Sequence, residues 1–195
     1  MKGSWVLLVT LVVMSTGCAF TPQAVVLRPD MQVAASSVGQ GRSVLVTVVD
    51  ERPRSTLGTR GVRGVGAEIT VEGDVLSVVR AAVSGGLQRQ GFTPTQQAPA
   101  DGRELRVEVR NLEYGLTQGF FSGTLRTECG LKAVCILGNS RPFEQLYRGE
   151  VQEGVAFVQG AEANEKYINT ALSRALNALL EDPKLSSCPA SKGQP

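Results

Sequence analysis

The stretch ELRVEVRNLEYGL, residues 104–116, decides the fold class. Its apolar residues stand at every second position, first at Leu105, Val107 and Val109 and then, after a shift of one residue at Asn111, at Leu112, Tyr114 and Leu116. A period of two is typical of a β-strand with one buried and one solvated face. A one-residue β-bulge near residues 110–112 would keep both apolar sets on the buried face. We therefore predict one long, bulged strand.

Two further strands follow it in the same pattern. Their inward-facing residues are Leu125, Cys129, Leu131, Ala133, Cys135 and Leu137, and then Phe143, Tyr147, Val151, Val155 and Phe157. The segments QGFFSG and LGNSRP have turn composition, so the three strands are predicted to form a meander. Its solvated side carries charges of both signs, which we expect to pair across strands: Glu104, Arg106, Glu108, Arg110, Arg126, Glu128, Lys132, Glu144, Arg148 and Glu150.

Residues 74–90 have apolar positions at helical spacing, with Asp74 as N-cap and Gly91 as C-terminal stop, and they predict a first helix. A second apolar stripe predicts a helix from about Ala161 to Glu181, closed by Pro183. The β-branched run VLVTVV predicts a central strand covered on both faces. The remaining predicted elements are short strands at 24–27 and 67–71 and a long loop at 50–66.

This order predicts an α+β fold: a mixed or antiparallel sheet with a three-strand C-terminal meander and two helices packed on one face. We expect one globular domain over residues 43–182, preceded by a short strand and linker within residues 18–42. Residues 183–195 are predicted to be a loose tail.

The N-terminus has the composition of an export signal. Lys2 precedes an apolar run at residues 5–14, which is about half the length that spans a bilayer. Ser15-Thr16-Gly17-Cys18 then resembles a bacterial lipobox, except that Ser15 stands where the pattern favours Leu or Val. We expect cleavage between Gly17 and Cys18 and acylation of Cys18, which would anchor the protein to a membrane. Ala19 favours the outer membrane, with the domain facing the periplasm.

Composition excludes several classes of function. The chain has no histidine, so it holds no Ser-His-Asp or Cys-His constellation, and we expect no catalytic residues, no metal and no cofactor. The formal net charge is +2, or +1 without Lys2, which disfavours nucleic-acid binding. The glycines of GTRGVRGVG lack the GK[ST] of a P-loop, so they predict a flexible loop.

Together, the lipobox, the element VTVVDERPRSTLG, a helix ending in LQRQGF and a final alanine-rich helix resemble the YajG family of bacterial lipoproteins. The resemblance covers nearly the whole mature chain, and none of its motifs is catalytic. It implies an envelope lipoprotein of undefined molecular role.

Two surfaces are candidates for function. Asp50, Arg52 and Arg54 follow the central strand, where they either tie the loop to the strand end or form an interaction site. The charged side of the meander is either a solvated face or a docking face. We expect a non-enzymatic protein that binds another envelope protein; the alternative is a carrier or sensor of a small apolar or envelope-derived ligand in a helix–sheet groove at Gly85 and Gly86. The sequence does not specify an oligomeric state.

The remaining cysteines are odd in number once Cys18 carries lipid. Cys129 and Cys135 are six residues apart in one predicted strand, about 20 Å, so we predict that they are not bonded to each other. Either all three thiols are free, with Cys188 in a mobile tail, or the tail folds back and Cys188 bonds one of the other two.

Overall fold

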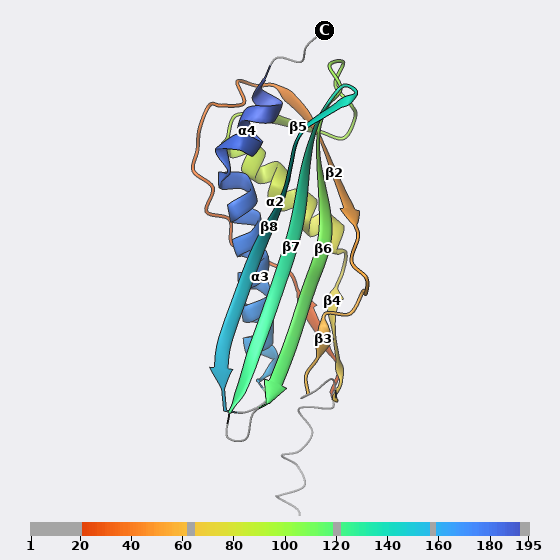
Figure 1. Cartoon of the computed structure of the whole chain (residues 1–195), viewed down its shortest axis with the longest axis vertical. Coiled ribbons are helices and arrows are strands. Elements are labelled where there is room, and N and C mark those ends of the chain that lie inside the picture. The colour runs from red at the N-terminus through yellow and green to blue at the C-terminus, as the bar shows by residue number, and fades with distance from the viewer. Residues whose placement is uncertain (1–20, 62–64, 119–121, 157–158, 192–195) are drawn as a thin grey trace, which may run out of the picture.

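The computed structural model of the protein describes residues 21–61, 65–118, 122–156 and 159–191 (Figure 1). Its sheet is built around one long strand, β6 (Arg103–Gln118). β6 pairs antiparallel with β7 (Gly123–Leu137), and β7 pairs antiparallel with β8 (Ser140–Val155). The pairing of β6 with β7 shifts register between Val109 and Asn111, so the predicted bulge is confirmed. The bulge keeps Val109 and Leu112 both on the buried face.

The other edge of β6 is shared by two sets of strands. Its first half pairs in parallel with β2 (Ser43–Asp50), which in turn pairs with β5 (Thr93–Thr95). Its second half meets β3 (Gly58–Thr59), which is followed across the sheet by β4 (Glu68–Glu72) and β1 (Gln23–Val26). The chain between β2 and β3 leaves the sheet after the Glu51 N–H bonds the Val109 carbonyl and returns where the Tyr114 N–H bonds the Leu57 carbonyl. The neighbour of β6 on this edge therefore changes from β2 to β3 beside the bulge, which divides this side of the sheet into two halves.

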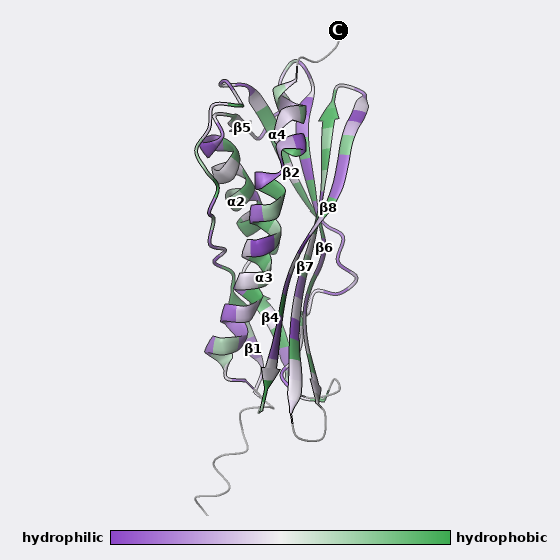
Figure 2. Cartoon of the chain, turned by 60° about the vertical axis from the view of Figure 1, so that its left-hand side comes forward, coloured by the Kyte–Doolittle hydropathy of each residue, from purple (hydrophilic) through white to green (hydrophobic). Residues whose placement is uncertain are grey.

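Three helices occur in the described part of the chain, and all lie on one side of the sheet (Figure 2). α2 (Val75–Arg89) begins where the Asp74 carboxylate accepts the N–H groups of Leu76 and Ser77. α3 (Ala161–Glu181) packs on β7 and β8, with its apolar stripe fully buried. Both predicted helices and the mixed α+β class are confirmed.

The sheet departs from the sequence prediction in two places. β2 is central, but only Val44, Val46 and Val48 are buried, whereas the alternate residues are half-buried, because helices cover one face alone. The predicted long loop at 50–66 contains β3, since the backbone of Gly58 approaches Tyr114 closely enough to pair with it.

The prediction of a loose C-terminal tail is wrong for Pro183–Ala190, which form α4. Asp182 caps this helix by accepting the Lys184 N–H at 2.8 Å, and it accepts the Tyr147 hydroxyl of β8 at 2.7 Å. A disulfide joins Cys188 of α4 to Cys135 of β7. Cys129 is a buried free thiol, so the prediction that Cys129 and Cys135 are not bonded is confirmed. Of the two alternatives for Cys188, the folded-back one is correct.

The segment after β1, predicted as a linker, lies along α3. Backbone N–H groups at alternate residues of this segment bond side chains that recur every four residues of the helix: Val26 to Glu165, Arg28 to Asn169, Asp30 to Ser173 and Gln32 to Asn177. Four helical residues rise about 6 Å and two extended residues about 6.6 Å, so the two repeats match. We call this contact the α3 ladder.

Candidate functional site

The predicted lipidation residue Cys18 and its neighbour Gly17 lie outside the described residues, so the site is built from the folded domain. Of the other predicted site residues, the structure keeps Asp50 and Arg52 together and places Arg54 elsewhere. This separation follows from the division of the sheet, because residues 51–57 cross from one half to the other.

Asp50 and Arg52 form a local ion pair. The Nε and Nη2 atoms of Arg52 donate to the two Asp50 oxygens at 2.8 Å each, and the Arg52 backbone N–H donates to Oδ1 at 3.1 Å. These hydrogen bonds lower the pKa of Asp50 below its ordinary value. The Arg52 side chain is only 7% exposed. Among the described residues its Nη1 has no hydrogen-bond partner. The pair thus fixes the start of the loop to the end of β2.

Arg54 lies on the opposite side of the sheet from the helices. It is 71% exposed and its guanidinium stands 3.8 Å from the Glu113 carboxylate. We call the face of β6, β7 and β8 that is turned away from the helices the outer face. Arg54 therefore belongs to the outer face and not to the Asp50–Arg52 pair.

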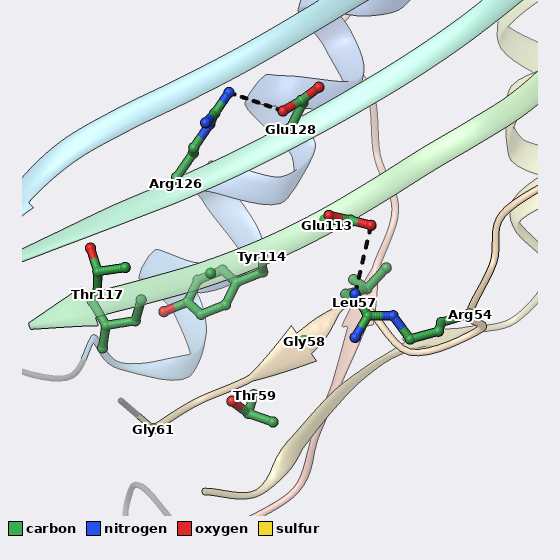
Figure 3. A pocket seen from close by; sticks show the side chains of 12 residues that line it. Arg54, Leu57, Gly58, Thr59, Gly61, Glu113, Tyr114, Thr117, Arg126 and Glu128 are labelled. Atoms are coloured by element: carbon green, nitrogen blue, oxygen red, sulfur yellow. Dashed lines mark hydrogen bonds and ion pairs between the residues drawn. The ribbon is translucent and has the colours of Figure 1, made fainter. Parts of the chain in front are cut away.

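The outer face holds a hollow of about 470 Å³ between β3, β6 and β7 (Figure 3). Its charged lining residues are Arg54 and Glu113 on one side and Arg126 and Glu128 on the other. Gly115 lies between them in β6, opposite Arg126, and its lack of a side chain leaves backbone uncovered there. The hollow thus presents both signs of charge around the exposed backbone of Gly115.

Ion pairs link most of the predicted outer-face charges, some within one strand and some across strands. Arg126 contacts Glu128 at 3.1 Å and Glu150 at 2.8 Å, while Lys132 contacts Glu144 at 2.7 Å and Glu108 at 3.9 Å. Arg106 and Arg110 also contact Glu108. The expectation of pairing across strands is confirmed for Arg126 with Glu150 and for Lys132 with Glu144 and Glu108, whereas the remaining pairs among these charges lie within one strand. Because most partners are substantially exposed, each pair contributes at most about 1 kcal/mol.

The interior at Gly86 is filled. A Cβ on Gly86 would lie 2.4 Å from a δ carbon of Leu180, so this glycine allows α2 to approach α3. Gly85, by contrast, has no atoms near its missing Cβ among the described residues.

The buried titratable groups are structural. Burial raises the pKa of the Cys129 thiol to about 12 and that of Tyr114 to about 12. Tyr114 donates its hydroxyl hydrogen to Asn164 at 2.9 Å, and Asn164 donates to Gln23 at 3.0 Å. These contacts join β6, α3 and β1. Within the described ranges, no cluster of three or more metal-ligating side chains occurs.

The sequence analysis missed the α3 ladder and the hydrogen bond that Arg60 donates to the Thr21 carbonyl. The ladder had a signal, because Glu165, Asn169, Ser173 and Asn177 recur at a spacing of four. The sequence carried no signal for the burial of Arg60, because an arginine in a glycine-rich loop is usually exposed. In the structure this arginine is only 5% exposed.

A family model described as an uncharacterized lipoprotein, Lipoprotein_16, matches residues 29–188. The chain belongs to this YajG family of bacterial lipoproteins. No curated protein matches the chain. Among the described residues of this YajG-family chain, no helix is long and apolar enough to cross a membrane.

Solved structures resemble this YajG-family chain at low sequence identity. A Xanthomonas campestris protein of family DUF330 has a TM-score of 0.55 and 13% identity, over 83% of this chain and 96% of that one. A Helicobacter pylori homolog of a neuraminyllactose-binding hemagglutinin has a TM-score of 0.48 and 11% identity, over 84% and 95%. A minor lipoprotein from Acinetobacter baumannii has a TM-score of 0.43 and 9% identity, over 76% and 92%. The similarity to the Xanthomonas campestris protein concerns the fold alone.

Proposed function

We propose that this protein is a non-enzymatic lipoprotein, anchored to the outer membrane through acylated Cys18 and facing the periplasm, that binds another envelope protein through its outer face. Membership of a bacterial lipoprotein family supports the location in the cell envelope. The observation that carries the binding proposal is the hollow lined by Arg54, Glu113, Arg126 and Glu128.

The character of this hollow favours a protein partner. It lies on the sheet face that the described helices leave uncovered, and its lining includes charged side chains of both signs. Such a pattern selects an oriented partner with complementary charges. Because exposed ion pairs are individually weak, Arg126 can exchange Glu128 or Glu150 for a partner's carboxylate at low cost.

The alternative, a carrier of a small apolar ligand, has less support. Leu180 occupies the space that Gly86 would have opened. Apolar ligands favour concave, mostly apolar sites, whereas the outer-face hollow has two arginines and two glutamates among its lining residues.

Photo-cross-linking tests the binding face. A photoreactive residue replacing Arg54 is expected to yield one dominant cross-linked protein in intact cells, and the same residue replacing exposed Arg80 of α2 is expected not to yield it. In the Arg54-labelled protein, Arg126→Glu should remove the product, because it places a third acid beside Glu128 and Glu150. Identical products from both positions, or a product unaffected by Arg126→Glu, would refute the proposed face.

The anchor is tested separately. Cys18→Ser is expected to abolish acylation and to leave uncleaved precursor, because only a thiol can form the thioether. Normal maturation of this variant would contradict the anchor.

A further inference from the structure

Thr21, the first residue that the structure describes, is held against the domain. Buried Arg60 donates from Nη1 to the Thr21 carbonyl at 3.0 Å. Two residues later, Gln23 donates from Nε2 to the Ala161 carbonyl at 2.7 Å and pairs with Ile69 as the first residue of β1. The chain is therefore held to the domain from residue 21 onward.

The covalent distance from Thr21 to Cys18 is short. Three residue steps separate them, and an extended chain advances at most about 3.6 Å per residue. The Cys18 backbone thus lies within about 11 Å of Thr21 in any conformation. The sixteen residues of β6 extend about 50 Å by comparison, so only one end of the domain is within reach of Cys18.

Several chain connections meet at this end of the domain. β1 begins there, β6 ends there at Gln118, β7 begins at Gly123 and α3 begins at Ala161 (Figure 1). Val65, in the connection between β3 and β4, is 64% exposed, which makes it the more exposed of the two exposed large apolar residues in the described part of the chain.

Apart from buried Arg60, the described residues of these connections carry no charge: they are Gly61, Val65, Gly66, Ala67, Ser122, Ala156, Gln159 and Gly160. At the opposite end, the connections at 96–102 and 138–142 read QQAPADG and GNSRP. An end whose described connections carry no exposed charged residue and expose Val65 loses little hydration of charged groups when it contacts lipid or another apolar layer.

We infer that the end of the domain marked by Thr21 and Val65 rests against the lipid surface, so that β6 runs away from the membrane. This inference rests on the proposed acylation of Cys18. The short tether brings the end to the bilayer, and Val65 supplies apolar contact there. A lipid surface fits better than a protein partner because the occupant must lie within reach of the acylated residue.

Tryptophan fluorescence in vesicles tests this orientation. The single tryptophan of the sequence is Trp5, so a chain of residues 18–195 reports only an introduced one. Cys18 can be coupled to a maleimide lipid, because Cys129 is buried and Cys135 is bonded to Cys188. Val65→Trp is compared with Asn139→Trp, an exposed position in the β7–β8 turn at the other end. The vesicles contain phosphatidylcholine with brominated acyl chains.

We expect brominated lipid to quench the Val65→Trp variant at least two-fold more than the Asn139→Trp variant, with a blue-shifted emission in the former. Glu162→Trp, an exposed position in the first turn of α3, provides a second probe at the same end and should follow the Val65 variant. Equal quenching at both ends, or stronger quenching at residue 139, would overturn the orientation.

The two proposals fail in distinguishable ways. The vesicle experiment couples Cys18 chemically, so it does not depend on acylation in the cell. The mass of the N-terminal peptide from native membranes reports acylation directly. An unmodified peptide would refute the anchor, whereas unquenched Val65→Trp and Glu162→Trp variants would refute the orientation.

Discussion

Gly149 of β8 lies directly against Ala171 of α3: a Cβ at Gly149 would stand 2.0 Å from the Ala171 carbonyl oxygen. Contacts under 3.0 Å essentially never occur for a Cβ, and here the neighbour is helix backbone, which cannot rotate away. The Arg174 guanidinium of α3 also donates to the Glu150 carbonyl beside this glycine. The absence of a side chain at one position therefore sets how closely α3 approaches the last strand of the sheet.

Gly149→Ala is expected to lower the free energy of unfolding by about 1–3 kcal/mol, because helix and strand must separate to admit the methyl group. Chemical denaturation measures the change. Gly154→Ala is the matched control in the same strand, since no atom lies within 4 Å of its added Cβ. Equal effects of the two substitutions would show that α3 and β8 do not pack as described.

Asn169→Ala should loosen the segment after β1. The Asn169 side chain accepts the Arg28 N–H and donates to the Val26 carbonyl, and loss of both bonds should cost about 1–2 kcal/mol. Hydrogen exchange at the Arg28 amide is expected to accelerate in this variant. Thr170→Ala, which alters a neighbouring hydroxyl bonded only within α3, should leave that amide unchanged. Unaltered exchange in Asn169→Ala would contradict the α3 ladder.

Reduction of the Cys135–Cys188 disulfide should destabilise the protein. The bond closes a loop of 53 residues, for which chain entropy predicts about 4 kcal/mol, and measured effects fall mostly at about 2–4 kcal/mol. Cys188→Ala is expected to show this loss, while Cys129→Ala, in the buried free thiol, loses only local packing. Peptide mapping without reduction should recover the Cys135–Cys188 pair. A Cys129–Cys135 pair would instead require β7 to be broken.

Asp50 makes stability depend on pH in the acid range. Its pKa in the folded protein is lowered by Arg52, so its contribution is fully present above the unfolded-state pKa, near 3.8, and is lost as pH falls through the lower folded value. Asp50→Asn should therefore show a shallower fall in unfolding free energy between about pH 5 and pH 2 than the wild type. Parallel pH profiles for the two proteins would argue against the ion pair.

Local patterns in the sequence predicted the elements that depend on local chemistry. The bulge near Asn111 followed from a one-residue change in apolar phase, and α2 followed from the Asp74 cap and Gly91. α3 begins and ends at the predicted residues. Each of these features is set by neighbours within a few positions along the chain.

The features that were missed depend on contacts distant in sequence. β3 is two residues long and exists because Gly58 meets Tyr114, and the separation of Arg54 from Asp50 follows from the path between two halves of the sheet. α4 carried a usable signal, since Asp182 followed by Pro183 is a typical helix start. Pro183 was interpreted only as the end of the preceding helix. A proline after a helix can open the next one.

The length of β6 also determines the distance between the two ends of the domain. For a domain held at Thr21, α4 and the Cys135–Cys188 disulfide lie at the far end, close to the full extent of a strand of about 50 Å. In the proposed orientation, the chain carries α4 at a fixed height above the bilayer that holds its acylated N-terminus. A reporter fused behind Ala190 would stand well out into the surrounding compartment, where it could meet components that never touch the bilayer.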